Sequence, residues 1–293
     1  MNWWKELKGK VKFFDPLSGH TTLRIGGPAK IFFEPKDCAD LKSALHLFKK
    51  YKIPFLVIGA GSNILAGDRG IKNAVVHLSA PYFKNIDFDG NHLEVGSGVM
   101  LNRIINEAAR QGLSGLEYFI GIPGTVGGAV AMNAGTKEKN IADLVEYVRV
   151  MDYQGRVKSL KKGEIKFAYR KSCLAKYIVL SVKLKLTRLK KIVIKDRINK
   201  LLNYRKCTQD LTFPSAGCVF RNPEMHSAGE LLDLCGLKNR RIGGACISDK
   251  HANFIINKGG ASSSDVLKLM SLAKRAVKKR FKIDLEDEIE IWQ

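Results

Sequence analysis

Two glycine-rich segments are the parts of the sequence whose residue types most clearly suggest chemistry. The first, residues 57–63 (VIGAGSN), follows a short apolar run, and the second, residues 121–135 (GIPGTVGGAVAMNAG), combines glycine with small and apolar residues and carries no charge. Glycine lets the backbone approach a ligand closely, and successive N–H groups can surround a pyrophosphate. The first segment lacks the third glycine of a Rossmann fingerprint and is equally typical of a tight turn. We interpret the second segment as a cradle for a long, flat ligand.

Further motifs extend over nearly the whole chain and, taken in order, resemble those of the bacterial UDP-N-acetylenolpyruvoylglucosamine reductases. In the N-terminal half the resemblance rests on residues 20–27 (HTTLRIGG) and on both glycine-rich segments. In the C-terminal half it rests on residues 169–172 (YRKS), 214–223 (PSAGCVFRNP), 248–254 (SDKHANF) and 285–289 (LEDEI). The chain has no room for the tyrosine-bearing insertion of one subgroup, so it resembles the shorter type.

The resemblance implies an α+β fold: an FAD-binding domain of the PCMH/vanillyl-alcohol-oxidase-like type in two lobes, and a smaller α+β substrate-binding domain. Interleaved strands and helices are typical of such a protein. We expect the FAD-binding domain over residues 1–187, with lobes of about 1–70 and 71–187. The substrate-binding domain is expected over residues 188–293, with its last strand closing on the active site.

The same resemblance implies FAD as a non-covalent cofactor and NADPH as a co-substrate. Residues 59–67 contain neither the His nor the Cys through which many oxidases of this scaffold attach their flavin, which favours non-covalent binding. The implied cofactor-binding residues are Arg24, Gly59, Ala60, Gly61, Ser62, Asn63, Gly121, Pro123, Gly124, Thr125, Gly127, Gly128, Ala129 and Asn133.

The family reduces the enolpyruvyl ether of a UDP-sugar to UDP-N-acetylmuramate, a precursor of peptidoglycan. Addition of hydride leaves negative charge on the carbon that bears the carboxylate, so this charge must be stabilised and then met by a proton donor. By motif match, Arg170 and Glu288 polarise the carboxylate and Cys218 donates the proton. Taken singly, these residues are more typical of a surface arginine, a solvated glutamate and a small core thiol, and the ordered match over the whole chain reverses that interpretation. The implied substrate contacts are Tyr169, Arg205, Lys206, Asn222 and His251.

Two positions depart from the commoner family pattern. Cys218 stands where most members have Ser, and Glu290 stands where many carry Arg. A thiol has a reference pKa of about 8.5, so it stays mostly protonated at neutral pH and can still serve as a proton donor. The thiol also exposes the site to oxidation and alkylation.

The formal charge of +22 is unusual for a protein of 293 residues. Such a charge suits a nucleic acid, a membrane surface or anionic small molecules. The excess is densest over residues 188–206, which have the pattern of an amphipathic basic helix. Its apolar positions are Ile192, Ile194, Ile198, Leu201 and Leu202. The diphosphate and carboxylate of the UDP-sugar and the phosphates of NADPH account for part of this charge without a nucleic acid or membrane partner.

Two other functions stay open on the sequence alone. Another oxidoreductase on the same FAD scaffold, such as an alcohol or lactone oxidase, would share the glycine-rich segments. A basic nucleic-acid-binding protein would use its glycines only in turns, and its affinity would depend steeply on salt. Flavin absorption bands would separate the nucleic-acid-binding protein from both enzymes.

The periodicity of apolar residues predicts the elements that position these side chains. Helices are expected over residues 37–51, 101–111, 188–206, 228–235 and 264–281, the last one capped by Ser264. Strands are expected over residues 54–59, 73–78, 92–95, 178–187, 245–247, 253–257 and 288–292, with a hairpin formed by residues 145–152 and 156–159. Around the last strand, Glu286, Glu288 and Glu290 should share one face because side chains alternate.

The remaining features concern location and assembly. No apolar stretch approaches the roughly 20 residues that span a bilayer, and the first residues carry charge where a signal peptide needs an apolar segment. The cysteines are scattered, without a C-x-x-C pair or metal-ligand spacing, as is common in a reducing compartment. We therefore expect a cytoplasmic monomer without a bound metal.

Overall fold

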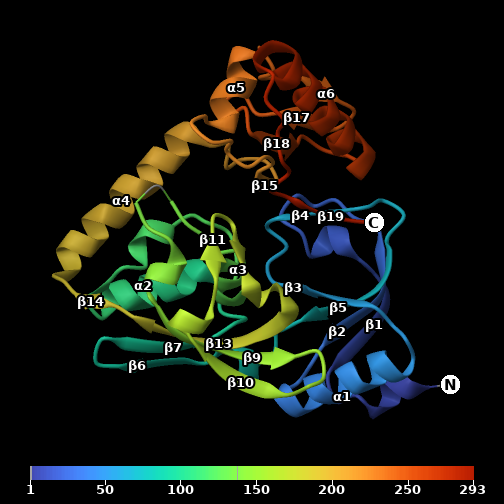
Figure 1. Ribbon diagram of the computed structural model, residues 1–293, viewed down its shortest axis with the longest axis vertical. Coiled ribbons are helices and arrows are strands. Elements are labelled where there is room, and N and C mark those ends of the chain that lie inside the picture. The colour runs from blue at the N-terminus through green and yellow to red at the C-terminus, as the bar shows by residue number, and fades with distance from the viewer. Residues whose placement is uncertain (1, 137) are drawn as a thin grey trace. The chain divides into compact units, whose positions relative to one another are not determined.

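The computed structural model describes residues 2–136 and 138–293, which form two compact units (Figure 1). Unit 1 contains the described residues up to Phe13, Ile31–Ala60 and those of Asn73–Asn203. Unit 2 contains Phe14–Lys30, Gly61–Lys72 and Tyr204–Gln293. Each unit is therefore assembled from segments that are distant in the sequence.

Unit 1 contains an antiparallel sheet of order β10-β9-β13-β7-β6. Its strands are β6 (Ile86–Asp89), β7 (His92–Gly96), β9 (Val145–Asp152), β10 (Val157–Lys161) and β13 (Tyr177–Lys185). In β13, which confirms the strand predicted over residues 178–187, Val182 and Leu184 are buried whereas Lys183 and Lys185 are not, so the strand has one buried face. The buried face packs against α2 (Leu101–Arg110) and α3 (Val126–Ala131).

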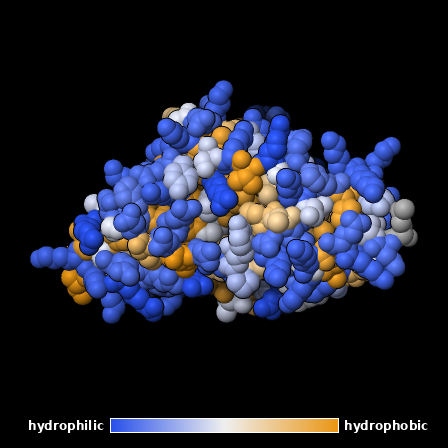
Figure 2. Space-filling view, turned by 90° about the horizontal axis from the view of Figure 1, so that it is seen from below, coloured by the Kyte–Doolittle hydropathy of each residue, from blue (hydrophilic) through white to orange (hydrophobic). Residues whose placement is uncertain are grey.

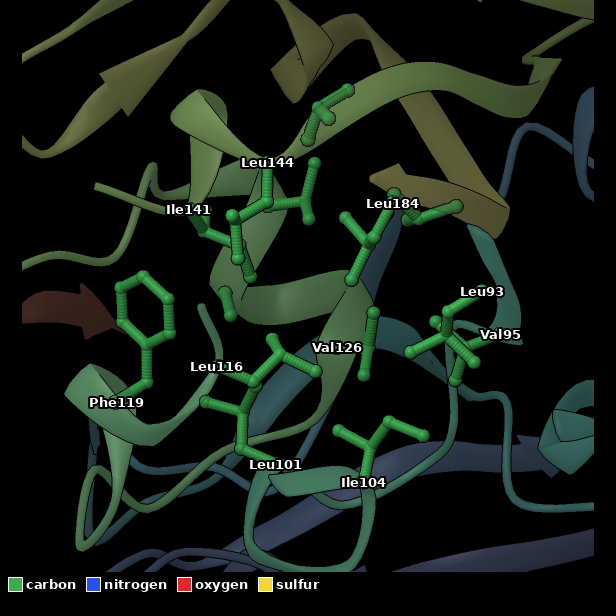
Figure 3. Close-up of a cluster of buried hydrophobic side chains, with 14 of the residues drawn as sticks. Leu93, Val95, Leu101, Ile104, Leu116, Phe119, Val126, Ile141, Leu144 and Leu184 are labelled. Atoms are coloured by element: carbon green, nitrogen blue, oxygen red, sulfur yellow. The ribbon is translucent and has the colours of Figure 1, made fainter. Parts of the chain in front are cut away.

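These helices and strands share one hydrophobic core, shown in Figure 3. Leu101 and Ile104 of α2 lie in it together with Val126, the first residue of α3. Leu93 and Leu184 come from the facing strands. Because Val126 is fixed in this core, the core also fixes the start of α3 and the glycine-rich segment that contains it.

A second core of unit 1 lies between helix α1 (Cys38–Lys50) and the neighbouring sheet of order β1-β2-β5-β3. The strands of this sheet are β1 (Lys10–Pro16), β2 (Pro28–Glu34), β3 (Phe55–Ile58) and β5 (Ile71–His77). Asp37 caps α1 by accepting a hydrogen bond from the backbone N–H of Asp40 at 2.9 Å. Strand β3 runs parallel to β5 and leads directly into the first glycine-rich segment.

Unit 2 contains an antiparallel sheet of order β15-β18-β17-β16 and two helices that share its core. The elements are β15 (Ser215–Cys218), β16 (Arg241–Ile242), β17 (Ala245–Ile247), β18 (Phe254–Asn257), α5 (Ala228–Leu234) and α6 (Ser263–Phe281). Strand β19 (Glu290–Trp292) pairs in parallel with β4 (Ile64–Ala66). Because β4 follows the first glycine-rich segment, the end of the chain is bound beside that segment.

Short elements complete the fold. The 3-10 helices are η1 (Trp3–Glu6), η2 (Leu17–Gly19), η3 (Pro81–Lys84), η4 (Glu117–Phe119), η5 (Ile141–Asp143), η6 (Lys162–Glu164) and η7 (Cys173–Lys176). Two-stranded pairs are formed by β11 (Phe167–Ala168) with β12 (Lys171–Ser172), and by β8 (Leu113–Ser114) with β14 (Thr187–Arg188). Helix α4 (Lys191–Thr208) begins in unit 1 and ends in unit 2.

Most of the predicted helices and strands are confirmed, but two details of the helices are wrong. The side chain of Ser262, and not that of Ser264, caps α6 by accepting a hydrogen bond from the N–H of Asp265. In the basic helix α4, Ile194 and Ile198 are buried as predicted, whereas Ile192 is 62% exposed. The first turn of α4 is therefore not docked through Ile192.

The expectation for the last strand is also wrong. Strand β19 starts at Glu290 and not at residue 288. Before it, Asp287 forms an isolated bridge with Phe220, and the chain bends at Ile289. Because of this bend, Glu288 and Glu290 do not belong to one regular strand, and alternation does not place them on a common face.

The surface accommodates the excess of basic residues. Figure 2 shows a face on which hydrophilic residues predominate and hydrophobic residues are scattered among them. In the part of the chain that the structure describes, no helix combines the length and the apolar character that crossing a bilayer requires.

Candidate active site

The two glycine-rich segments meet at Gly59 and Thr125 in unit 1. Gly59 follows strand β3, and Thr125 is the N-cap of α3. A Cβ atom on Gly59 would lie 2.6 Å from Oγ1 of Thr125, closer than side chains come in proteins. Glycine at position 59 thus permits a close approach between two parts of the protein itself.

The first turn of α3 uses its backbone donors inside the protein. The N–H of Val126 donates to the carbonyl of Val99 at 2.8 Å, and the N–H of Gly127 donates to that of Ser97 at 2.9 Å. The N–H of Gly128 donates to Oγ1 of Thr125 at 3.3 Å. A ligand at this end of α3 would therefore meet the outer side of the turn rather than these three N–H groups.

Gly127 and Gly128 face opposite environments. A Cβ on Gly127 would lie 2.7 Å from Cβ of Ser97, whereas Gly128 is exposed and a Cβ there would have Oγ1 of Thr125, at 3.5 Å, as its near neighbour. The hydroxyl of Ser97 is buried and has no hydrogen-bond partner among the described residues. Buried polar atoms in proteins are nearly always hydrogen-bonded, so a hydroxyl without a protein partner indicates a water molecule or a bound group at this place. The exposed backbone at Gly128 leaves room for a flat cofactor, as FAD is.

The later part of the first glycine-rich segment belongs to unit 2. Gly61 has a φ of +62°, and a Cβ there would collide with the carbonyl oxygen of His20. Its own carbonyl accepts a hydrogen bond from the N–H of Thr22 at 3.1 Å. Arg24 is exposed and has a φ of +56°. This conformation is uncommon for residues other than glycine and is concentrated at functional sites.

Arg170 and Tyr169 form the turn of the β11–β12 hairpin in unit 1. Arg170 has a φ of +53°, and its guanidinium lies 5.0 Å from the ring centre of Tyr169. Nδ2 of Asn133 donates to the carbonyl of Ala168, directly before this turn, at 2.9 Å. Oδ1 of Asn133 accepts from the N–H of Ala142 at 3.3 Å. The buried amide of Asn133 therefore connects the second glycine-rich segment to the turn that carries Arg170.

Cys218 and Glu288 lie on adjoining backbone segments of unit 2. Cys218 ends β15, and the next residue, Val219, accepts a hydrogen bond from the N–H of Glu288 at 2.8 Å. One residue further along, Phe220 bridges to Asp287. Both Cys218 and Glu288 are partly buried. The structure thus brings two of the three predicted catalytic residues together, while Arg170 belongs to unit 1.

Asn253 holds the segment that follows Cys218. Its Oδ1 accepts from the N–H of Phe220 at 2.9 Å, and its Nδ2 donates to the carbonyl of Phe220 at 2.8 Å. The carbonyl of Asn253 accepts from the N–H of Val219 at 2.9 Å. This role of Asn253 is not predicted from the sequence. A buried Asn within an apolar run is a signal, but nothing in the sequence indicates a partner 33 residues away.

His251, a predicted substrate contact, is held as a neutral imidazole in unit 2. Burial lowers the pKa of His251, and the charge of Lys238 lowers it further. Nδ1 of His251 accepts from the N–H of Asn253 at 3.2 Å, and the ring packs against Phe254 with 4.7 Å between ring centres. In this arrangement Nε2 carries the proton and is the hydrogen-bond donor of the ring.

The other predicted substrate contacts in unit 2 are near the ends of two helices. Oδ1 of Asn222 accepts from the N–H of Ala228 at 3.0 Å, at the start of α5. Arg205 and Lys206 lie in the last turn of α4, where Nη1 of Arg205 donates to Oε1 of Gln209 at 3.4 Å. The side-chain oxygen of Asn222 and the guanidinium of Arg205 thus make local contacts in addition to any contact with a ligand.

Comparison with known proteins shows similarity along the whole chain. Residues 209–292 match the family model for the C-terminal domain of UDP-N-acetylenolpyruvoylglucosamine reductase, and residues 29–161 match that of an FAD binding domain. The UDP-N-acetylenolpyruvoylglucosamine reductase 1 of Bacillus cereus is 41% identical, over 97% of this chain and 95% of that protein. The reductase of Moorella thermoacetica is 41% identical, over 98% of this chain and 94% of that protein.

Solved structures agree with these relationships. The UDP-N-acetylenolpyruvylglucosamine reductase (MurB) of Thermus caldophilus has a TM-score of 0.84 and 39% identity, over 98% of this chain and 100% of that chain. BBE-like 1 of Physcomitrella patens has a TM-score of 0.50 at 16% identity, over 64% of this chain and 44% of that chain, which is a likeness of fold alone. The predicted fold class, α+β with an FAD-binding domain of the PCMH/vanillyl-alcohol-oxidase-like type, is confirmed. The chain belongs to the UDP-N-acetylenolpyruvoylglucosamine reductase family.

Proposed function

We propose that the protein is an FAD-dependent oxidoreductase that uses NADPH to reduce UDP-N-acetylenolpyruvoylglucosamine to UDP-N-acetylmuramate for peptidoglycan synthesis. The observation that carries this proposal is the sequence similarity of nearly the whole chain to reductases of that name. The Bacillus cereus and Bacillus subtilis reductases are 41% and 39% identical to this chain over 97% of its length. The matched regions include both glycine-rich segments and the segments of Cys218 and Glu288.

Arg24, residues 59–63 and residues 121, 123–125, 127–129 and 133 are proposed to hold FAD without a covalent bond. The exposed backbone at Gly128 supports this assignment. When bound, FAD supplies the hydride that reduces the substrate after taking it from NADPH. The protein holds the cofactor and the substrate in the orientation that hydride transfer requires, and this orientation raises the reaction rate.

Cys218 is proposed as the proton donor. In the reaction, the vinyl ether C=CH2 gains a hydride at its terminal carbon and a proton at the carbon that bears the carboxylate, which gives a CH–CH3 group. A thiol within hydrogen-bond reach can supply that proton. The position of Cys218 next to the segment of Glu288 supports a shared role for the two side chains.

Arg170 and Glu288 are proposed to stabilise the negative charge that develops on the carboxylate-bearing fragment. A guanidinium is permanently charged and matches a carboxylate with two parallel hydrogen bonds. Glu288 would act in this role when protonated or hydrogen-bonded, because a bare carboxylate would repel the developing charge. Tyr169, Arg205, Lys206, Asn222 and His251 are proposed as contacts of the UDP-sugar.

The proposal extends to location and assembly. Cys38, Cys173, Cys207, Cys235 and Cys246 are free thiols. This supports a reducing compartment, in which we place the enzyme as a cytoplasmic monomer. The assignment of residues 1–187 to FAD binding and of residues 188–293 to substrate binding remains part of the proposal. The placement of Cys218, His251 and Glu288 in unit 2 supports the second half of it.

Anaerobic half-reactions test this function. The purified protein should show flavin absorption bands, and acid denaturation should release FAD into the supernatant. NADPH should bleach the flavin bands without oxygen, and UDP-N-acetylenolpyruvoylglucosamine should restore them with formation of UDP-N-acetylmuramate. An alcohol or lactone oxidase would be reoxidised by oxygen and not by this substrate, whereas a nucleic-acid-binding protein would show no flavin bands. Either result would overturn the proposal.

A further inference from the structure

Within unit 2, Thr22 joins the 61–63 loop to the strand that ends at Cys218. The N–H of Thr22 donates to the carbonyl of Gly61 at 3.1 Å. The hydroxyl of the same residue donates to the carbonyl of Ser215 at 2.7 Å. Ser215 is the first residue of β15, and Cys218 is its last. The hydroxyl also lies 3.5 Å from the carbonyl oxygen of Gly61, so Thr22 contacts both the loop and this strand.

Asn63 joins the same loop to the segment that carries Glu288. Nδ2 of Asn63 donates to the carbonyl of Glu288 at 2.9 Å. The carbonyl of Asn63 accepts from the N–H of Glu290 at 2.9 Å, where β19 begins to pair with β4. Because Glu288 precedes the regular strand, the ladder alone does not fix it, and the amide of Asn63 supplies the missing restraint.

The hydrogen bonds of Thr22 and Asn63 belong to one connected network. The N–H of Glu288 donates to the carbonyl of Val219, the residue after Cys218, at 2.8 Å. In this network Thr22 links the 61–63 loop to β15, and the residue that follows β15 is hydrogen-bonded to Glu288. Asn63 then links Glu288 back to the loop. Hydrogen bonds in such a network reinforce one another, so loss of one loosens the others.

We propose that Thr22 and Asn63 are positioning residues that couple occupancy of the 61–63 loop to the placement of Cys218 and Glu288. The inference rests on the proposed function, which assigns the loop to FAD and proton donation to Cys218. Thr22 and Asn63 act through backbone carbonyls, so their loss displaces the donor without removing it. A displacement of about 1 Å can lower a rate by about 10²-fold. In Thr22 variants that lack the hydroxyl, the half-reaction that needs the proton should therefore be slowed, and flavin reduction by NADPH should not.

Thr21 provides a matched control. Its hydroxyl donates to the carbonyl of Ile25 at 3.0 Å, within the same turn, and the residue is buried. Thr21→Val and Thr22→Val both replace a hydroxyl by a methyl group of similar size. A merely structural role for Thr22 predicts the same outcome for both variants, whereas the positioning role predicts a difference.

The test combines hydrogen exchange with half-reaction kinetics. Exchange is followed by mass spectrometry at residues 215–220 and 286–290, in the holoenzyme and after removal of FAD, for wild type, Thr21→Val, Thr22→Val, Thr22→Ser and Asn63→Asp. In wild type and Thr21→Val, removal of FAD should speed exchange in both segments. In Thr22→Val the segment 215–220 should exchange fast with or without FAD, and in Asn63→Asp the segment 286–290 should do so. Thr22→Ser, which keeps the donor, should respond like wild type.

The kinetic result should follow the same pattern. Thr22→Val should slow flavin reoxidation by the enolpyruvyl UDP-sugar by about tenfold, while flavin reduction by NADPH changes less than about twofold. The inference is overturned if Thr22→Val matches Thr21→Val in both measurements, or if FAD removal leaves exchange unchanged in wild type. If Thr22→Val does not fold, Thr22→Ala, which also lacks the hydroxyl, takes its place and is judged by the same criteria. Failure of wild type to be reoxidised by the substrate would instead reject the proposed function, and the exchange result would still decide the coupling.

Discussion

The turn of Arg170 and the segments of Cys218 and Glu288 are positioned by side-chain hydrogen bonds of very different span. In unit 1, Asn133 and Ser172 bridge 35 and 41 residues when they donate to the carbonyls of Ala168 and Ala131. In unit 2, Thr22 and Asn63 bridge 193 and 225 residues when they donate to the carbonyls of Ser215 and Glu288. Bringing more distant segments together costs more chain entropy, by about 0.6 kcal/mol for each doubling of the loop length.

The segments of the two units suit two different functions. The unit 1 segments are compact and regular, with a capped helix and a short hairpin, which suits a fixed surface for a cofactor. The unit 2 segments have an irregular backbone, with a bulge in the β15–β18 pairing and a bend before β19. We therefore expect changes in the second glycine-rich segment to alter flavin content, and changes at Cys218 or Glu288 to alter reaction of the reduced enzyme with its substrate.

The largest effect is expected from Cys218→Ala. Loss of a positioned acid typically costs about 10²- to 10⁴-fold in rate. Flavin reoxidation by the substrate should slow by that factor in stopped-flow measurements, while reduction by NADPH stays close to wild type. Cys218→Ser keeps an O–H donor in nearly the same place and should retain most of the rate. Equal reoxidation rates for Cys218→Ala and wild type would remove Cys218 from the mechanism.

Glu288→Gln should have the next largest effect. Removal of one group that stabilises developing charge costs roughly 10²-fold, again in reoxidation only. Glu286→Gln and Glu290→Gln are the controls, because both residues are exposed. The carboxylate of Glu286 forms a surface ion pair in which its Oε2 lies 3.4 Å from Nη1 of Arg221. Similar small losses of reoxidation rate for all three variants would show that the acidic residues are interchangeable and that Glu288 does not act together with Cys218.

Gly127→Ala and Gly128→Ala test the unit 1 side of the comparison. Because a Cβ on Gly127 would press on Ser97, Gly127→Ala should lower the free energy of unfolding by about 1–3 kcal/mol. Gly128→Ala should leave the free energy of unfolding of the flavin-free protein unchanged or raise it by up to about 1 kcal/mol, as Ala favours a helix. Its ratio of flavin to protein should nevertheless fall. A fully yellow Gly128→Ala variant would reject the cradle.

The smallest effect concerns pH and His251. Burial lowers the pKa of His251 in the folded protein, so the unfolded chain binds a proton more readily. Its contribution to stability is therefore present above the unfolded pKa and is lost as pH falls through about 6.5 toward the lower folded pKa. In urea unfolding, wild type should lose more stability between pH 7.5 and 5.5 than His251→Gln, by less than about 1.4 kcal/mol per pH unit. An identical loss in both proteins would show that His251 is not held neutral.

Local chemistry made part of this structure predictable. The N-cap Asp37, the alternation in β13 and the glycine-rich segments depend on near neighbours in sequence, and the structure contains each of them. The cap of α6 was misplaced because three consecutive serines can each cap a helix. The choice is made by Ser263, which donates to Asp68, 195 residues away.

The parts that could not be predicted depend on long-range contacts. The bend before β19 follows from the bridge between Phe220 and Asp287, which alternation cannot reveal. Thr22 and Asn253 escaped notice for the same reason, since their partners lie on strands that meet only in the folded chain. Motif order located Cys218 and Glu288, but only the backbone hydrogen bond at Val219 places them side by side.

The most direct test of the central claim is the position of solvent hydrogen in the product. The enzyme is equilibrated in D2O, so that exchangeable groups such as the Cys218 thiol carry deuterium, and is given unlabelled NADPH and the enolpyruvyl UDP-sugar. Proton nuclear magnetic resonance of the UDP-N-acetylmuramate then shows where deuterium lies. If an exchangeable acid of the protein donates the proton, deuterium should lie in a single configuration at the carbon that bears the carboxylate. Protium at that carbon would contradict proton donation by an exchangeable acid of the protein.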